Sequence, residues 1–125
     1  MTKIVQVGIV SDVVCPWCVV GKGNFDQALT LIENEKALDI QVEVTWLPFQ
    51  LNPGMASEGE NINEHLSQKY GLTADQLAAN KANLVNAGKA VGFDFNFNQR
   101  SRIYNTFDAH LLMTWAANSE QGAVN

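Results

Sequence analysis

Both cysteines of the chain lie three residues apart, as Cys15 and Cys18, within residues 11–23. Two thiols at this spacing are able to close a small internal disulfide or to resolve a mixed disulfide with another molecule. An apolar, β-branched run over residues 4–10 precedes them, and an amphipathic segment follows them. A strand, a short loop and a Cys-x-x-Cys at the start of a helix indicate thiol–disulfide chemistry.

The start of the expected helix favours a thiolate at Cys15. The first helical turn carries unpaired N–H groups and the positive end of the helix dipole, and both stabilise negative charge. We therefore expect a lowered pKa for Cys15, in a range of about 3.5–7.5, which makes this residue the nucleophile. Pro16 suits the first helical position because its missing N–H needs no partner there. Trp17 is expected to be partly exposed beside the thiol, as an apolar docking surface.

Three other interpretations of the cysteine pair stay open. Half of a zinc site would need two further ligands, and His65 and His110 show no paired spacing, so we expect no metal. A structural disulfide at this spacing would close too small a loop to restrain the unfolded chain much. The pair is also compatible with two inert, buried thiols.

Four charged or titratable residues outside the pair are weaker candidates. Asp12 is a candidate for proton handling near the thiols, or else it caps the turn after the strand. Lys22 lies two helical turns beyond Cys15, so a solvated lysine is the simpler interpretation. We expect His65 to be exposed, and His110 to be a structural histidine on a mostly apolar helix.

The composition indicates an acidic, globular protein. The 125 residues allow one hydrophobic core, and 46% of them are hydrophobic. The net charge is −5 and no basic run is present, so we expect no nucleic-acid partner. We read no signal peptide at the amino terminus and no apolar stretch of membrane-spanning length. We therefore expect a cytoplasmic protein, in which a close cysteine pair is more often catalytic than structural.

Two strands and a helix must position the cysteines. Residues 3–10 predict a short buried strand, and residues 40–47 alternate as a second strand does. Apolar spacings of three and four predict a helix between them, from the cysteines to about residue 34. Gly21 and Gly23 in this helix either allow a close approach or pack tightly on the sheet. Together these elements predict a right-handed βαβ unit with Cys-x-x-Cys at the carboxyl end of its first strand.

The remaining residues predict mainly helices. A loop over residues 48–54 ends the second strand. Asn61 and Thr73 each begin a sequence that resembles a capping box, and Gly71 and Gly92 are suited to end the helices that follow. The elements predicted here are helices over residues 61–70 and 74–91, an extended loop over residues 93–98 and a last helix that begins near residue 105 or 106.

Four groups of residues, in order over nearly the whole chain, closely resemble the DsbA-like thioredoxin-fold oxidoreductases. The nearest resemblance within that family is to the FrnE-type subfamily. Cys-x-x-Cys alone would not be specific, whereas the four groups together are. They are Ser11-Asp12-Val13-Val14-Cys15-Pro16-Trp17-Cys18 with Gly21-Lys22, Pro48-Phe49-Gln50-Leu51-Asn52-Pro53, Val91-Gly92-Phe93-Asp94-Phe95, and Asn105-Thr106-Phe107-Asp108-Ala109-His110.

The resemblance implies an α/β fold, a thioredoxin-like βαβ unit with an inserted helical domain. It assigns residues 1–54 to the amino-terminal half of the thioredoxin-like domain and residues 55–125 to an incomplete helical insert. It implies Cys15 as nucleophile and Cys18 as resolving thiol. The further site residues that we expect are Pro16, Trp17 and Asp12 as supporting residues, and Gln50, Asn52, Asn105 and His110 as candidates for the substrate cleft.

One feature departs from the family pattern. The family fold finishes with a cis-proline loop opposite the cysteines, a β-hairpin and a last helix. The chain has three prolines, Pro16, Pro48 and Pro53, and none follows the helical segment. We expect an amino-terminal portion of a longer protein, a cleaved piece that binds its remainder, or a product that pairs with a second copy. In each case we expect weaker substrate handling than in a complete family member.

The sequence supports three hypotheses about function. The first is a disulfide oxidoreductase or isomerase that acts on protein or small-molecule thiols and disulfides without a metal or an organic cofactor. The second is a glutathione-dependent, kappa-like isomerase or transferase with glutathione as co-substrate, although such enzymes typically carry a serine where Cys15 stands. The third is an inactive fragment or a helical binding module.

Overall fold

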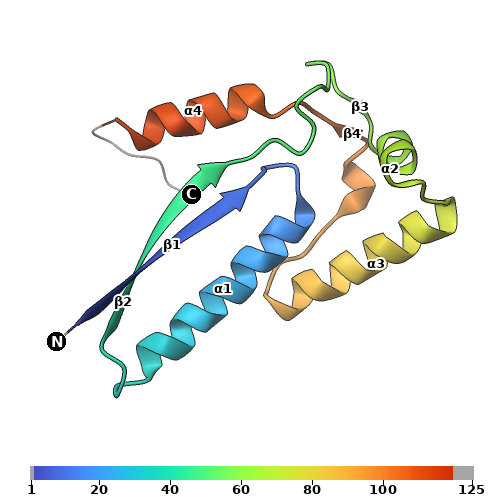
Figure 1. Ribbon diagram of the computed structural model, residues 1–125. Helices are drawn as coiled ribbons and strands as arrows, with labels where there is room; N and C mark the ends of the chain where they lie inside the picture. The colour runs from blue at the N-terminus through green and yellow to red at the C-terminus, as the bar shows by residue number, and fades with distance from the viewer. Residues whose placement is uncertain (1, 120–125) are drawn as a thin grey trace.

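The computed structural model describes residues 2–119, which begin with two parallel strands joined by a helix (Figure 1). The predictions that concern residues 120–125 lie outside this range. The mixed α/β architecture that we predicted is confirmed, and it begins with β1 (Lys3–Ser11), α1 (Pro16–Asn34) and β2 (Ile40–Pro48). The later elements are β3 (Glu60–Asn61), α2 (Ile62–Tyr70), α3 (Ala74–Ala90), the 3-10 helix η1 (Phe97–Gln99), β4 (Arg102–Ile103) and α4 (Phe107–Ala117).

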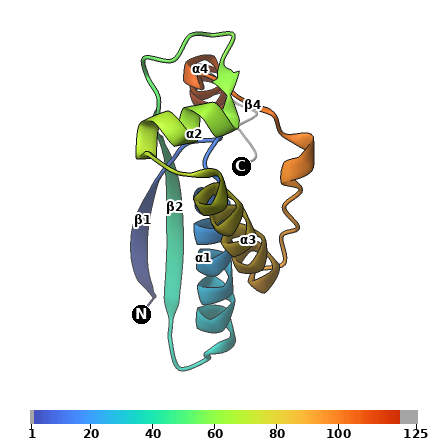
Figure 2. The same ribbon diagram turned by 90° about the vertical axis from the view of Figure 1, so that its right-hand side faces the viewer.

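The first two strands pair in parallel over their whole length. Lys3 is the partner of Ile40 at one end of the ladder, and Ser11 is the partner of Pro48 at the other. The prediction of a buried strand was wrong, because Ile4 is 56% exposed. Figure 2 shows the reason: α1 and α3 lie on one side of the strands. Side chains alternate across a strand, so half of them point away from these helices.

The helical part begins and ends its helices at the residues that the sequence predicts. The Asn61 side chain accepts a hydrogen bond from the N–H of Glu64 at 3.1 Å, and Thr73 forms a full capping box with Gln76. Gly71 ends α2 at a positive φ of 65°, a conformation that glycine adopts without steric cost. Satisfied N–H groups at both helix starts explain why local sequence located these helices well.

A close contact holds α1 against the end of α3. A Cβ added at Gly23 would lie 2.6 Å from the Cβ of Val91, so no larger residue fits without displacement. Gly21, by contrast, has open space around it. Gly23 therefore allows a close approach of α3, the first of the two alternatives that the sequence left open, rather than packing on the sheet.

The loop over residues 93–98 contains no strand, as predicted, and ends in η1. The ring of Phe95 packs against Phe93 at a centroid distance of 4.8 Å and stacks on Phe97 at 5.2 Å. A Cβ at Gly88 would lie 2.6 Å from the Phe95 ring, so the missing side chain at Gly88 leaves room for this ring to pack against α3.

A short antiparallel bridge between distant segments was not predicted from the sequence. Glu60 pairs with Ile103 and Asn61 with Arg102, which joins β3 to β4 (Figure 1). Ile103 is among the most buried side chains, with 5% exposure. Two-residue strands carry no periodic pattern, so only the tertiary packing reveals the pair.

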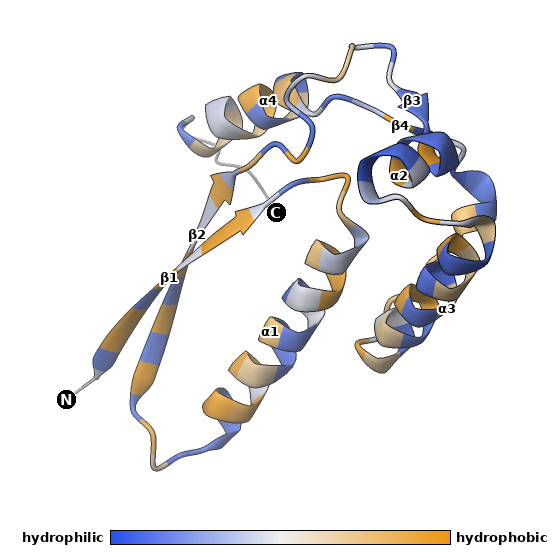
Figure 3. Ribbon diagram, turned by 45° about the vertical axis from the view of Figure 1, so that its right-hand side comes forward, coloured by the Kyte–Doolittle hydropathy of each residue, from blue (hydrophilic) through white to orange (hydrophobic). Residues whose placement is uncertain are grey.

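The buried apolar core is small, and much apolar surface is exposed. Trp115 on α4 is 69% exposed, and Figure 3 shows hydrophobic residues along α4 and both long strands. Among residues 2–119, no helix has the length and apolar character needed to cross a membrane. The division into residues 1–54 and 55–125 stays a prediction. The buried apolar side chains among the described residues are Val20, Met55, Leu77, Leu84 and Ile103.

Candidate functional site

The two thiols lie at the beginning of α1, just beyond the carboxyl end of β1. Cys15 is the N-cap residue, Pro16 is the first residue of the helix, and Cys18 lies in the first turn. Both cysteines are free thiols and half-buried. The backbone N–H of Cys15 donates to the carbonyl of Asp12 at 3.1 Å, which fixes the turn between strand and helix. The geometry agrees with the predicted arrangement of strand, loop and Cys-x-x-Cys.

The lowered pKa that we expected for Cys15 is not what the structure gives. Burial raises the pKa of Cys15, and the neighbouring Cys18 raises it further, while the N–H groups of Trp17 and Cys18 act in the opposite direction. The helix start therefore does stabilise negative charge at Cys15, as the sequence indicated, but desolvation and the second thiol outweigh it.

The lowered pKa belongs to Cys18. Burial raises the pKa of Cys18, but hydrogen bonds from the Asp12 backbone N–H, the Ser11 side chain and Cys15 outweigh that effect. The charge of the Asp12 carboxylate opposes the lowering. The two thiols interact directly, so after one ionisation the remaining proton is shared between their sulfurs.

Asp12, which acts on Cys18, forms a buried pair with His110. Asp12 is 3% exposed and His110 is 7% exposed, and Asp12 Oδ1 lies 3.1 Å from His110 Nε2. Asp12 Oδ2 accepts a hydrogen bond from the N–H of Leu51 at 2.8 Å. Burial raises the pKa of Asp12, but the hydrogen bonds from Leu51, Thr106 and His110 lower it below its ordinary value. The Asp12 side chain thus does not cap the turn; it joins β1, the loop after β2 and α4.

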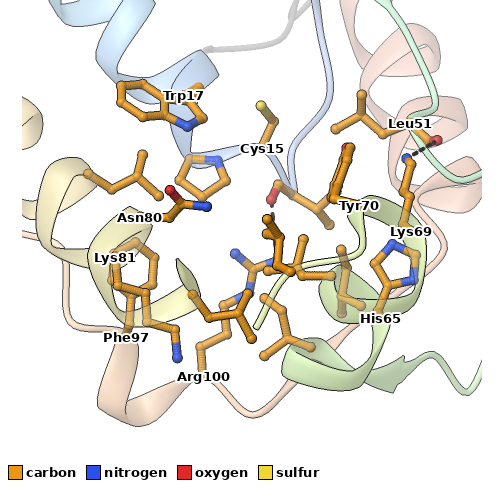
Figure 4. A pocket seen from close by; sticks show the side chains of 18 of the residues that line it. Cys15, Trp17, Leu51, His65, Lys69, Tyr70, Asn80, Lys81, Phe97 and Arg100 are labelled. Carbon is orange, nitrogen blue, oxygen red and sulfur yellow. Dashed lines mark hydrogen bonds between the residues drawn. The ribbon is translucent and has the colours of Figure 1, made fainter. Parts of the chain in front are cut away.

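A cavity of about 420 Å³ opens on the other side of Cys15, between the start of α1 and the helical part (Figure 4). Trp17 borders it and is 53% exposed, as predicted. Cys15 lines the cavity, whereas Cys18 does not. The lining residues are Val14, Cys15, Pro16, Trp17, Leu51, Asn52, Ile62, His65, Leu66, Lys69, Tyr70, Leu72, Leu77, Asn80, Lys81, Leu84, Phe97, Arg100 and Ile103.

Arg100 is a site residue that the sequence analysis missed. Its guanidinium donates to the carbonyl of Val14 at 3.2 Å, across 86 residues of sequence. Burial lowers the pKa of Arg100, and the charge of Cys15 acts in the opposite direction, so the guanidinium lies near the sulfur of Cys15. Figure 4 shows Arg100 reaching from the far wall of the cavity toward the segment that carries Cys15. No local motif in the sequence marks this arginine.

The four cleft candidates occupy different places. Asn52 lines the cavity and accepts a hydrogen bond from Lys69 at 2.9 Å. Gln50 does not line the cavity, and neither does Asn105, which donates to the carbonyl of Met55 at 2.8 Å. The structure thus brings only one of the four to the cavity wall, and His110 bonds to Asp12 instead.

The two histidines and Lys22 also have defined surroundings. His65 was expected to be exposed, but its side chain is 12% exposed and bonds to Asn52 and Glu60 at the cavity wall. Lys22 forms an exposed ion pair with Asp26, which agrees with a solvated lysine. Within residues 2–119, no group of three or more His, Cys, Asp or Glu is arranged to hold a metal ion.

Comparisons with known proteins agree with this geometry. Over 77 residues the chain is 35% identical to the uncharacterized protein YwbO of Bacillus subtilis (strain 168), an alignment that covers 62% of this chain and 34% of that protein. The crystal structure of the probable DsbA oxidoreductase SCO1869 from Streptomyces coelicolor matches with a TM-score of 0.75 and 35% identity. That match covers 89% of this chain and 46% of the other. The chain thus spans less than half the length of either relative.

The family assignment rests on the extent of a separate match. The DSBA-like thioredoxin domain family matches residues 6–125, which is almost the whole chain. The matched range contains the cysteines, most of β1, the whole of β2 and all the helices described above. The parallel strands, the helix that begins at Cys-x-x-Cys and the match to a solved DsbA-like structure agree with it. The chain belongs to the family of DsbA-like thioredoxin domains.

Proposed function

We propose that the protein is a thiol–disulfide oxidoreductase of the FrnE type, with Cys15 as nucleophile and Cys18 as resolving thiol. The observation that carries this proposal is the different placement of the two sulfurs. Cys15 lines the cavity, where a substrate has access, whereas Cys18 does not line it and is influenced by the charge of the buried Asp12 carboxylate. A substrate disulfide therefore meets Cys15 first.

The reaction that this geometry supports has two exchanges. The Cys15 thiolate attacks one sulfur of a substrate disulfide, a mixed disulfide forms, and the first substrate thiolate leaves. The Cys18 thiolate then attacks the Cys15 sulfur and releases the second substrate thiolate. The cysteine pair supplies both electrons, so the reaction needs no metal or organic cofactor. In the reverse direction the oxidised pair accepts two electrons from a substrate dithiol.

The buried Asp12–His110 pair is suited to handle the proton of Cys18. The backbone of Asp12 bonds to Cys18, and the Asp12 side chain is held by three hydrogen-bond donors. The Asp12 carboxylate opposes negative charge on Cys18, so it favours the protonated form of this thiol, and its own lowered pKa keeps Asp12 ionised at neutral pH. We therefore propose Asp12 as a positioning residue that influences the protonation of Cys18, which is the first of the two roles that the sequence left open.

The substrates that we propose are protein or small-molecule thiols and disulfides, handled in the cytoplasm. Since the chain spans less than half of its relatives, the complete activity is expected to need more than residues 1–125, either the remainder of the fold or a second copy. The assignment of residues 1–54 to a thioredoxin-like half and of residues 55–125 to a helical insert belongs to the same proposal.

A glutathione-dependent, kappa-like reaction is the alternative that the cavity also favours. Glutathione carries two carboxylates, and cationic side chains line the cavity beside Cys15. The presence of a cysteine at position 15 and of a second thiol at position 18 argues for disulfide exchange instead.

A redox titration of the 125-residue chain in glutathione buffers, read by alkylation and intact mass, tests the proposal. We expect one two-electron transition to an internal Cys15–Cys18 disulfide, at a potential of roughly −270 to −120 mV. Persistent glutathione adducts on Cys15 would favour the glutathione-dependent class. An absence of oxidation, with slow alkylation at neutral pH, would contradict the proposal for this chain and favour the inactive binding module.

A further inference from the structure

The cavity beside Cys15 has an unusual charge for this protein. Acidic residues outnumber basic ones by 13 to 8 in the chain, yet no aspartate or glutamate in the part of the chain that the structure describes lines the cavity. Three of the eight basic residues do line it: Lys69, Lys81 and Arg100. Among residues 2–119, none of these three forms an ion pair with a carboxylate. The cavity is therefore a cationic region on an anionic molecule.

The three cations differ in how far the protein already satisfies them. Lys69 donates to the carbonyl of Leu51 and to the side chain of Asn52, at 3.1 and 2.9 Å, and Lys81 donates to Asn63 at 3.1 Å. The half-buried guanidinium of Arg100 makes one hydrogen bond, to the carbonyl of Val14. A guanidinium has five N–H donors, so most of the donors of Arg100 remain for a bound anion.

The rest of the lining is mainly apolar. Aliphatic and aromatic side chains from α1, α2, α3 and η1 surround the cations, and the ring of Trp17 closes one side (Figure 4). A volume of about 420 Å³ falls in the size range of small-molecule sites. The lining thus fits an apolar body with one anionic group better than a polypeptide segment of high polarity.

We propose that this cavity binds small disulfides with an apolar or aromatic body and a carboxylate, with the carboxylate paired to Arg100 and the disulfide presented to Cys15. A guanidinium forms two parallel hydrogen bonds with a carboxylate, which fixes the direction of the ligand as well as holding it. The proposal rests on the proposed function and names its substrate class.

The exchange balances without a further reactant. Cys15 bonds to one sulfur of the disulfide R–S–S–R, and the first R–S⁻ leaves. Cys18 then bonds to the Cys15 sulfur, and the second R–S⁻ leaves. The protein dithiol loses two electrons and two protons, and the substrate disulfide becomes two thiols.

Two aromatic disulfides of opposite character test the proposal. The probe 5,5′-dithiobis(2-nitrobenzoate) carries two carboxylates, and 2,2′-dithiodipyridine is neutral at pH 7. We expect Arg100→Gln to slow the reaction of the reduced protein with the anionic probe by about tenfold or more, because a charge-assisted bond is lost. Loss of Arg100 also weakens the stabilisation of the Cys15 thiolate, and this effect is the same for both probes. The neutral probe experiences this effect alone, and we expect its reaction to slow by less than about threefold.

Two further variants separate a specific site from a general charge effect. Lys81→Gln removes a cavity charge and leaves the Val14 contact intact, and we expect it to slow the anionic probe alone by about threefold. Arg102→Gln is the matched control, since Arg102 is exposed, donates to the carbonyl of Glu58 and does not line the cavity. It is expected to leave both rates unchanged. Equal slowing of both probes by Arg100→Gln would overturn the proposal, and so would equal effects of Arg100→Gln and Arg102→Gln.

A binding measurement separates this inference from the proposed function. In the Cys15→Ser protein no exchange is possible at position 15, and calorimetry compares 3-nitrobenzoate with its neutral amide, 3-nitrobenzamide. We expect the anion to bind at least about tenfold more tightly, and Arg100→Gln in the same background to remove the difference. Binding of this kind without disulfide exchange in the wild-type chain would contradict the proposed function alone. Exchange without a preference for the anion would overturn the cavity proposal alone.

Discussion

The two cysteines lie one helical turn apart, yet they face regions of opposite character. Cys15 borders a cavity lined by apolar and cationic residues, among them Arg100. Cys18 does not line the cavity, and its pKa responds to Asp12, a member of the buried Asp12–His110 pair. One thiol therefore borders a space that a ligand can enter, and the other is influenced by an internal carboxylate. The roles that we propose for the two thiols follow from what surrounds them, because the spacing between two cysteines does not distinguish one from the other.

Replacement of the cysteines one at a time tests this comparison most strongly. Cys15→Ser is expected to reduce disulfide exchange to the background rate, because the sulfur that lines the cavity is lost. Cys18→Ser is expected to leave the first exchange intact and to trap a mixed disulfide on Cys15, since no resolving thiol remains. Intact mass after incubation with a small disulfide measures both outcomes. A trapped adduct on Cys18 in the Cys15→Ser protein, at the wild-type rate, would show that the two regions are equally accessible.

The buried Asp12–His110 pair predicts that the free energy of unfolding depends on pH. The folded-state pKa of Asp12 is lowered from its ordinary value of 3.8. Its contribution to stability is therefore fully present above pH 3.8 and is lost as the pH falls through the lower folded-state pKa. Asp12→Asn is expected to lower the free energy of unfolding by about 1–3 kcal/mol at pH 7, because the buried donors lose a charged acceptor.

Urea unfolding between pH 2.5 and pH 7 measures this effect. We expect the stability of the wild-type chain to fall toward acid pH and that of Asp12→Asn to fall less steeply. Asp26→Asn serves as the control, because Asp26 is an exposed carboxylate paired with Lys22 on the surface of α1. If both variants shifted the pH profile equally, the buried pair would have no special part in stability.

The cavity beside Cys15 lies between α1 and the helical part, so its shape depends on how α1 packs against α3. The same substitution at two glycines of α1 tests this packing. Gly23→Ala is expected to destabilise the chain by about 1–3 kcal/mol, because the added methyl group overlaps Val91. Gly21→Ala has open space and is expected to stabilise α1 by about 0.5–1 kcal/mol through helix propensity. Thermal unfolding of the two proteins gives the difference directly. Stabilisation of similar size in both would mean that α1 and α3 are not in contact at this point.

Local sequence located the secondary structure well. Residues that begin and end helices, such as Asn61 and Gly71, act through hydrogen bonds and dihedral angles within a few positions, so their sequence neighbours suffice to predict them. The alternation over residues 40–47 predicted β2 for a similar reason. The bridge between β3 and β4 escaped prediction because two residues are too short for any period to appear.

Burial was predicted less well than secondary structure. The β-branched run of β1 suggested a strand covered on both faces, but Ile4 is 56% exposed. His65 was expected in solvent and instead lies at the cavity wall. Exposure depends on which elements pack on a given face, and nothing within one segment specifies its neighbours across the fold.

The sequence by itself determined the pair of thiols, their position at a helix start after a parallel strand and the family to which the chain belongs. The tertiary structure alone decided which thiol meets the cavity and which meets the carboxylate. Arg100 reaches the Cys15 region across 86 residues, and His110 reaches Asp12 across 98. The pKa of a thiol responds to desolvation and to every charge within a few ångströms, and chain folding rather than sequence spacing sets those distances.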